Sequence, residues 1–161
     1  MIGKMAALLM MAGIDANAEE RKRIVVSIPD RKLVLLCGDR VVKIYDVAVG
    51  KSSTPTPAGE FRIATRVPNP TWYGPGKIVP PGADNPLGSR WMGLGYRGYG
   101  IHGTNLPGSV GKAASHGCIR MRRHDIEELF ELVDVGTTVE LHSERPALVA
   151  IILSFSVAIA D

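Results

Sequence analysis

Short β-type runs separated by turn residues dominate this amino-acid sequence. Ile24, Val26 and Ile28 alternate with residues of the opposite face, which is the period of two expected for a strand. The runs at 33–37 and 41–49 are joined by a Gly-Asp pair that is typical of a hairpin turn. Further β-type runs lie at 59–67, 90–94, 99–102 and 137–141. We therefore predict a mainly β fold, built as a β-sandwich or a mixed-sheet domain.

One segment has the period of an amphipathic helix. Ile126, Leu129, Phe130 and Val133 recur at the spacing of one helix face, and glutamates occupy the other face. Gly136 is placed to end the helix. We expect these acidic residues to form a solvated face and not a catalytic pair.

A segment rich in proline and glycine, residues 68–88, interrupts the strand series and carries Trp72 and Tyr73. Proline lacks a backbone donor, so we expect neither a helix nor an inner strand to persist through this segment. Long loops in compact domains are often lids or binding loops. We expect this one to border a substrate site, because it leads towards the histidine-bearing run 99–102. The alternative is a passive, well-packed insertion.

The two ends of the chain differ in composition from its middle. Residues 1–18 have the pattern of a secretory signal peptide, with Lys4, an apolar run and an Ala-Asn-Ala cleavage site. The apolar run is well short of the ~20 residues that span a bilayer, so we expect cleavage and export to the periplasm or cell wall. We expect residues 19–142 to form the catalytic domain. The apolar tail, 143–161, is expected to be a strand or helix packed on the core, with membrane association as the alternative.

The net charge of +3 is small and evenly spread. The longest basic cluster covers only residues 21–23, which is too short to indicate a nucleic-acid-binding surface. We therefore expect no nucleic-acid partner. A mild positive charge is compatible with an anionic polymer as the substrate.

Candidate catalytic residues are concentrated in two short motifs. His102 lies in the run 101–104 and Cys118 in the run 115–120. A thiol needs a nearby imidazole to accept its proton or to stabilise its thiolate at neutral pH. These two residues therefore carry the parts of a cysteine nucleophile and its base. We expect His116 to point to the opposite face, which makes His102 the better candidate for the base.

Gly117 lets the backbone approach a tetrahedral intermediate, and the N–H groups of Gly117 and Cys118 are candidate donors to its oxyanion. Zinc binding by His102, His116, Cys118 and His124 is the competing interpretation, but the His-x-Cys spacing is too tight for a structural site. We expect no metal and no cofactor. For Cys37, we expect a buried structural role and no disulfide.

These motifs resemble the L,D-transpeptidase catalytic domain of the YkuD or ErfK type, in which a histidine upstream of a Ser-His-Gly-Cys-Ile-Arg block serves the cysteine. The run 51–61 looks like the family's Thr-Pro-x-Gly turn, and 85–94 and 98–105 look like its later strands. The resemblance covers about residues 23–141. It implies an L,D-transpeptidase fold for the domain, with one helix after the cysteine.

The resemblance also implies an enzyme that acts on peptidoglycan stem peptides outside the cytoplasmic membrane. Cys118 would attack the carbonyl of the third stem residue and expel the terminal D-alanine. It would then pass the acyl group to an amine of a second stem or of an anchored acceptor protein. His102 would act as base and then as acid, oriented by the backbone carbonyl of Gly103. A hydrolase or L,D-carboxypeptidase using the same thiolate is the alternative.

The remaining candidate residues would shape the oxyanion loop and the substrate pocket. Arg120 would brace the site or bind a substrate carboxylate, and Trp91 and Tyr99 would form pocket walls or fill the core. The full set of candidate oxyanion and substrate-binding residues is Gly117, His116, Ser115, Arg120, Thr104, Trp91 and Tyr99.

Overall fold

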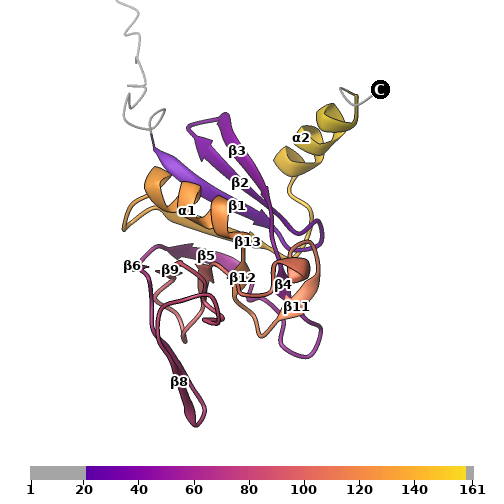
Figure 1. Ribbon diagram of the computed structural model, residues 1–161. Coiled ribbons are helices and arrows are strands. Elements are labelled where there is room, and N and C mark those ends of the chain that lie inside the picture. The colour runs from indigo at the N-terminus through magenta and orange to yellow at the C-terminus, as the bar shows by residue number, and fades with distance from the viewer. Residues whose placement is uncertain (1–20, 159–161) are drawn as a thin grey trace, which may run out of the picture.

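The computed structural model describes residues 21–158, and the predicted signal peptide lies outside this range. Within this range the fold is mainly β, as the strand pattern predicts, with two larger mixed sheets, two two-stranded pairs and two α-helices. Figure 1 shows helix α1 lying against the larger sheet.

The larger sheet has five strands, and its centre joins the two ends of the domain. Its first and last strands in the chain, β1 and β13, pair in parallel, while all its other neighbours are antiparallel. In spatial order the strands are β3 (Arg40–Asp46), β2 (Lys32–Cys37), β1 (Lys22–Ser27), β13 (Thr138–His142) and β5 (Gly59–Arg62).

The second sheet has four strands and carries both catalytic motifs. Its strands β10 and β12 are parallel neighbours. In spatial order the strands are β12 (Ile119–Arg120), β10 (Gly100–His102), β9 (Arg90–Gly93) and β6 (Thr65–Pro68). A short parallel pair, β4 (Val49–Gly50) and β11 (Ala113–Ser115), precedes the cysteine, and a 3-10 helix spans Pro107–Ser109. The run 59–67, predicted as one stretch, is thus divided between the two sheets.

The main core joins both sheets to helix α1 (Arg123–Leu132). The helix buries Ile126, Leu129 and Phe130, which are three of the four residues that predicted its apolar face. Fully burying a large apolar side chain contributes about 1.5–3 kcal/mol. This cluster fixes the second sheet, and with it the catalytic motifs, against the larger sheet.

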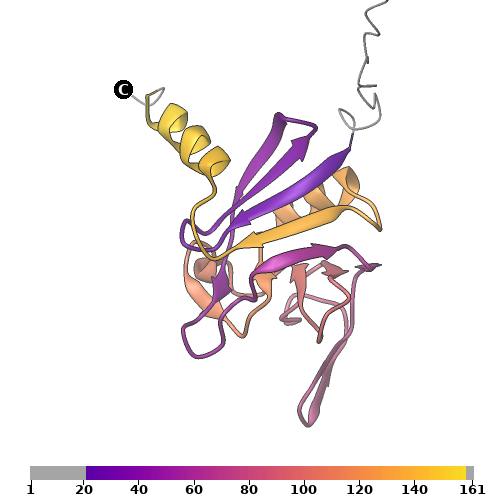
Figure 2. The ribbon, with the colours of Figure 1, turned by 180° about the vertical axis from the view of Figure 1, so that it is seen from behind.

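The apolar tail forms a second helix, α2 (Ala147–Ala158). It begins on the face of the larger sheet that is turned away from α1, as the rear view in Figure 2 shows. Val149 is fully buried against Val25, Val34 and Leu36. These sheet residues alternate with residues of the main core, because successive side chains on a strand point to opposite faces. Of the two forms expected for the tail, a packed helix is the one observed. Among the described helices, none is long and apolar enough to cross a membrane.

The Pro/Gly-rich segment contains a hairpin that its composition does not predict. Strands β7 (Trp72–Gly74) and β8 (Lys77–Val79) pair in an antiparallel ribbon that projects from the domain (Figure 1). Prolines flank these strands at positions 70 and 80 and do not interrupt them. A separate two-stranded ribbon needs few ladder hydrogen bonds, so proline excludes only an inner strand here.

A buried asparagine holds the base of this hairpin. The side chain of Asn85 is fully buried, and its amide nitrogen lies 2.8 Å from the carbonyl oxygen of Pro70 and 3.1 Å from those of Val79 and Pro80. Its amide oxygen accepts the N–H of Leu87 at 2.9 Å. One side chain therefore ties the two ends of the hairpin together.

Candidate active site

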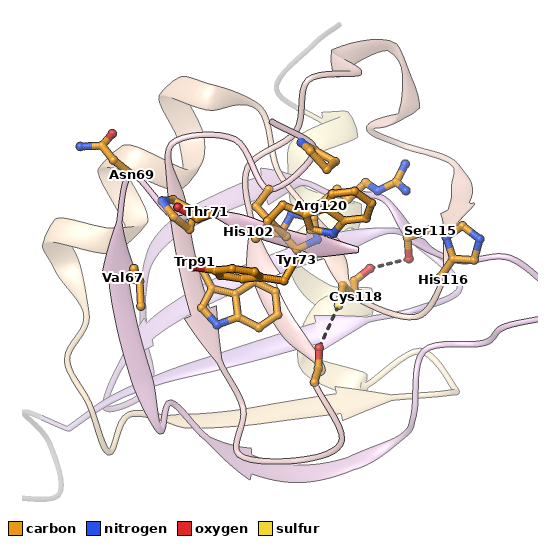
Figure 3. A pocket seen from close by; sticks show the side chains of 15 residues that line it. Val67, Asn69, Thr71, Tyr73, Trp91, His102, Ser115, His116, Cys118 and Arg120 are labelled. Atoms are coloured by element: carbon orange, nitrogen blue, oxygen red, sulfur yellow. Dashed lines mark hydrogen bonds between the residues drawn. The ribbon is translucent and has the colours of Figure 1, made fainter. Parts of the chain in front are cut away.

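Two parallel strands bring the two catalytic motifs together. His102 ends β10 and is paired in register with Arg120 on β12, and Cys118 immediately precedes β12. Residues two apart in an extended segment point to the same side. This register places His102, Arg120 and Cys118 on one face, and all three line a single cavity of about 870 Å³ (Figure 3).

The His102 imidazole is held in one orientation and one tautomer. Its side chain is buried, and its Nδ1 lies 2.5 Å from the carbonyl oxygen of Gly103. A carbonyl oxygen can only accept, so Nδ1 carries the proton and Nε2 keeps a free lone pair. The indole of Trp91 stacks on the imidazole with ring centroids 5.6 Å apart. Both contacts leave Nε2 as the basic atom of the ring.

Burial lowers the pKa of His102 from 6.5 to about 4, and the positive charge of Arg120 acts in the same direction. The hydrogen bond to Gly103 opposes this shift. The imidazole is therefore neutral at physiological pH and able to accept a proton.

The Cys118 thiol is in its neutral form as well. Burial raises its pKa, and the positive charge of Arg120 partly offsets that effect. Its Sγ lies 3.7 Å from the carbonyl oxygen of Gly98, a long contact typical of a thiol donor. A neutral thiol beside a neutral imidazole cannot attack a carbonyl efficiently until its proton moves. Nucleophilic attack must therefore be coupled to proton transfer.

His116 lies where the sequence analysis did not expect it. Its side chain is exposed and lines the same cavity as Cys118, so the expectation that it points to the opposite face is wrong. Residues two apart on a strand share a face, and residues 116–118 form a bend between β11 and β12. At Gly117 φ is +119°, and a Cβ would lie 2.4 Å from the ring of Tyr99. Only glycine fits this position without strain.

The hydrogen bonds inside this bend revise the expected oxyanion donors. The N–H of Gly117 donates to Ser115 Oγ at 3.0 Å. That hydroxyl in turn donates to the carbonyl of Cys118 at 2.5 Å (Figure 3). Gly117 is thus already satisfied within the protein. The N–H of Cys118 is the remaining candidate of the two.

The other candidate residues divide into two groups. Trp91 lines the cavity, whereas Thr104 and Tyr99 do not contribute to its wall. The Thr104 hydroxyl accepts the N–H of Leu106 at 3.0 Å, and Tyr99 stacks on Tyr96. The structure therefore gives Thr104 a turn-forming contact and places Tyr99 beneath Gly117 as a packing residue.

Comparison with known proteins decides which family the chain belongs to. The family model of the YkuD type, described as the L,D-transpeptidase catalytic domain, matches residues 21–141. The chain belongs to the L,D-transpeptidase catalytic domain family. YkuD of Bacillus licheniformis, a protein named for this family, is 47% identical over 119 residues, which cover 74% of this chain and 64% of that protein. The matched segment thus spans less than two thirds of that relative.

Solved structures of L,D-transpeptidases share the fold. The NMR structure of the catalytic domain of the E. faecium L,D-transpeptidase superposes with a TM-score of 0.62 at 29% identity, covering 76% of this chain and 98% of that one. The carbamoyl enzyme formed by Ldtfm with avibactam superposes with a TM-score of 0.67 at 28% identity, covering 78% of this chain and 50% of that one.

In this L,D-transpeptidase domain the hairpin segment supplies much of the cavity wall. Trp72 and Tyr73, named in the sequence analysis, both line it. Further wall residues lie in or beside residues 68–88 but are not individually predicted from the sequence. These are Val67, Asn69, Pro70, Thr71, Pro86 and Leu87.

The side chains that could bind a metal ion are the next feature of the fold. Among residues 21–158, no group of three or more His, Cys, Asp or Glu side chains is placed to hold a metal ion. Cys37 is half-buried at the end of β2 in the other sheet, and no disulfide joins it to Cys118.

Proposed function

We propose that this protein is a peptidoglycan L,D-transpeptidase of the bacterial cell envelope, exported by its N-terminal segment. The observation that carries the proposal is the cavity in which the thiol of Cys118 and the oriented, neutral imidazole of His102 share one wall. Membership of the L,D-transpeptidase family supplies the reaction class. A structural relative, Ldtfm, forms a carbamoyl enzyme with avibactam. This supports the proposal that a side chain of the present enzyme accepts an acyl group.

The proposed reaction proceeds by two acyl transfers. The Sγ of Cys118 attacks the carbonyl carbon of the third stem residue while its proton passes to Nε2 of His102. The resulting oxyanion accepts a hydrogen bond from the backbone N–H of Cys118. The intermediate collapses to a thioester, and the C–N bond breaks as His102 returns the proton to the leaving D-alanine. An amine of a second stem peptide, or of an anchored protein, then attacks the thioester and regenerates the thiol.

Arg120 is proposed to assist this reaction through its charge. Its guanidinium lines the cavity, where it favours the anionic form of Cys118 and the neutral form of His102. It is the cationic lining residue and therefore the candidate partner for a carboxylate of the stem peptide. Its backbone N–H and carbonyl also pair with those of Ala48, which holds β12 in place.

The proposal is tested by incubating the purified protein, lacking residues 1–18, with disaccharide-tetrapeptide and determining product masses. We expect a cross-linked dimer together with free D-alanine. A monomer shortened by one alanine, with no dimer, would assign the thiol to a carboxypeptidase. Unchanged substrate would contradict both enzymatic assignments.

The β7–β8 hairpin is proposed to bind the stem peptide. Replacing Trp72 and Tyr73 together with alanine should lower kcat/KM with disaccharide-tetrapeptide by about 30-fold, because each ring buries apolar surface worth about 1 kcal/mol and about 1.4 kcal/mol corresponds to a factor of ten. Tyr73→Ala alone should lower it without moving the Tm, since its ring is 75% exposed. Phe155→Ala, which removes an exposed ring on α2, is the matched control. If kcat/KM is the same in all three variants, the hairpin does not bind the stem peptide.

A further inference from the structure

A buried threonine that is distant in sequence from the catalytic motifs contacts the loop that carries the nucleophile. Thr56 is 6% exposed and lies in the turn between β4 and β5. Its hydroxyl accepts the N–H of Gly50 at 2.8 Å and donates to the carbonyl of Gly117 at 2.9 Å. Both bonds are buried, so water does not compete for them. The hydroxyl therefore has one fixed rotamer and one fixed direction for its proton.

This contact determines the orientation of the peptide unit next to the nucleophile. The carbonyl of Gly117 and the N–H of Cys118 belong to the same planar group, and the bond between them is trans. In a trans peptide the C=O and N–H vectors point in opposite directions. Holding the Gly117 oxygen towards Thr56 therefore directs the Cys118 N–H away from the buried threonine. Two residues of this loop, His116 and Cys118, line the cavity.

The other hydrogen bonds of this loop act on the neighbouring peptide units. Gly117 has a φ of +119°, in a region where glycine moves at low cost. The neighbouring hydrogen bonds from Thr54 Oγ1 and from the Lys51 N–H both end on the carbonyl of Ser115, at 3.1 and 3.0 Å. They fix the start of the loop. Ser115 Oγ holds the Gly117 N–H and the Cys118 carbonyl, which belong to the peptide units before and after. The Thr56 hydroxyl holds the Gly117–Cys118 peptide itself.

We propose that Thr56 is a positioning residue that aims the backbone N–H of Cys118 at the oxyanion formed during acylation. The inference rests on the proposed role of Cys118 as an acylated nucleophile. Thr56 itself does not touch the substrate. Its contribution is to an interaction that exists only when a carbonyl oxygen becomes negatively charged.

Two reagents that share the thiolate but differ in their transition states test this proposal. With p-nitrophenyl acetate, Cys118 attacks the carbonyl, an oxyanion forms, and p-nitrophenolate leaves as the thioester is made. With iodoacetamide, the thiolate displaces iodide at carbon and no oxyanion forms. A misdirected oxyanion donor should therefore slow the first reaction and spare the second.

The decisive variant is Thr56→Val, which keeps the shape of the side chain and removes its hydroxyl. Losing an oxyanion donor outright costs about 10²- to 10³-fold, so misdirecting one should slow acylation by about 10- to 100-fold. Alkylation by iodoacetamide should stay within about twofold of the wild-type rate. Thr56→Ser keeps the hydroxyl and should restore most of the acylation rate.

The matched control is Thr54→Val, because the Ser115 carbonyl keeps its bond to the Lys51 N–H and acylation should stay near the wild-type rate. Acylation by Thr56→Val within twofold of wild type would overturn the inference, and so would an equal fall in acylation and alkylation. A wild-type protein that the ester does not acylate at Cys118 would overturn it as well. A wild type that reacts with the ester but leaves disaccharide-tetrapeptide unchanged would contradict the transpeptidase proposal alone.

Discussion

Replacing Cys118 with alanine is expected to abolish turnover of disaccharide-tetrapeptide, with a loss of at least about 10⁴-fold, as for removal of other enzyme nucleophiles. A carbamoyl adduct with avibactam, of the kind present in the Ldtfm relative, should be absent from the mass spectrum of this variant. The fold should persist, because the substitution removes one half-buried sulfur atom and leaves the hydrogen bonds of residues 115–117 in place.

The second thiol provides the control for this result. Cys37→Ala changes a residue of the other sheet and should retain both turnover and the adduct. Loss of the reaction in Cys37→Ala, with activity retained in Cys118→Ala, would show that the nucleophile has been misassigned. Activity that persists in the presence of a chelator would argue against the alternative in which the same histidines and cysteine bind zinc.

The sequence predicts those parts of the fold whose pattern is local. Alternation around Ile24 and Val26 identifies β1, and the apolar spacing from Ile126 to Val133 identifies α1, because each element buries one regular face. Helix α2 is apolar on all sides, so its sequence has no period that would distinguish a helix from a strand. Its assignment depends on the contact of Val149 with the back of the sheet, which no local pattern contains.

The site shows the same division between local and distant information. His102, Gly103 and Cys118 are recognisable because their motifs are short and chemically specific. The expectation for His116 fails because residues two apart in an extended segment share a face, which places His116 on the side of Cys118. The bend at Gly117 depends on a glycine conformation and on contact with Tyr99, which lies earlier in the chain. Thr56 is separated from Gly117 by 61 positions, and Asn85 acts through three carbonyls of a proline-rich turn. Single polar residues of this kind carry no signal until the chain is folded.

Replacing His102 with alanine is expected to lower the rate of acylation by about 10²- to 10⁴-fold, the range typical of a lost general base. The thiol of Cys118 is neutral at pH 7, since burial raises its pKa, so attack without a proton acceptor draws on a small thiolate fraction. His116→Ala should cost less, because His116 is exposed and no hydrogen bond fixes its ring among the described contacts. Equal and complete loss in both variants, with folding preserved, would show that the two histidines share the role.

The pH dependence of acylation and stability tests the environment of His102 independently of the substrate. The acylation rate of the wild type should fall as the pH drops through about 4, because His102 is then protonated and cannot act as a base. Burial lowers the pKa of the folded imidazole to about 4. In the unfolded chain the same group binds a proton near pH 6.5. Between these values the unfolded state holds more protons, so stability falls as the pH decreases through this window, by about 3 kcal/mol in total.

Urea unfolding of wild type and His102→Ala at pH 7 and pH 4.5 separates this contribution from that of other groups. The stability difference between the two proteins should shrink on acidification, because only the wild type pays for an imidazole that must stay neutral while folded. A constant difference at both pH values would mean that His102 titrates normally in the native state. It would then be substantially protonated at mildly acidic pH, and the base would have to be sought in the exposed imidazole of His116.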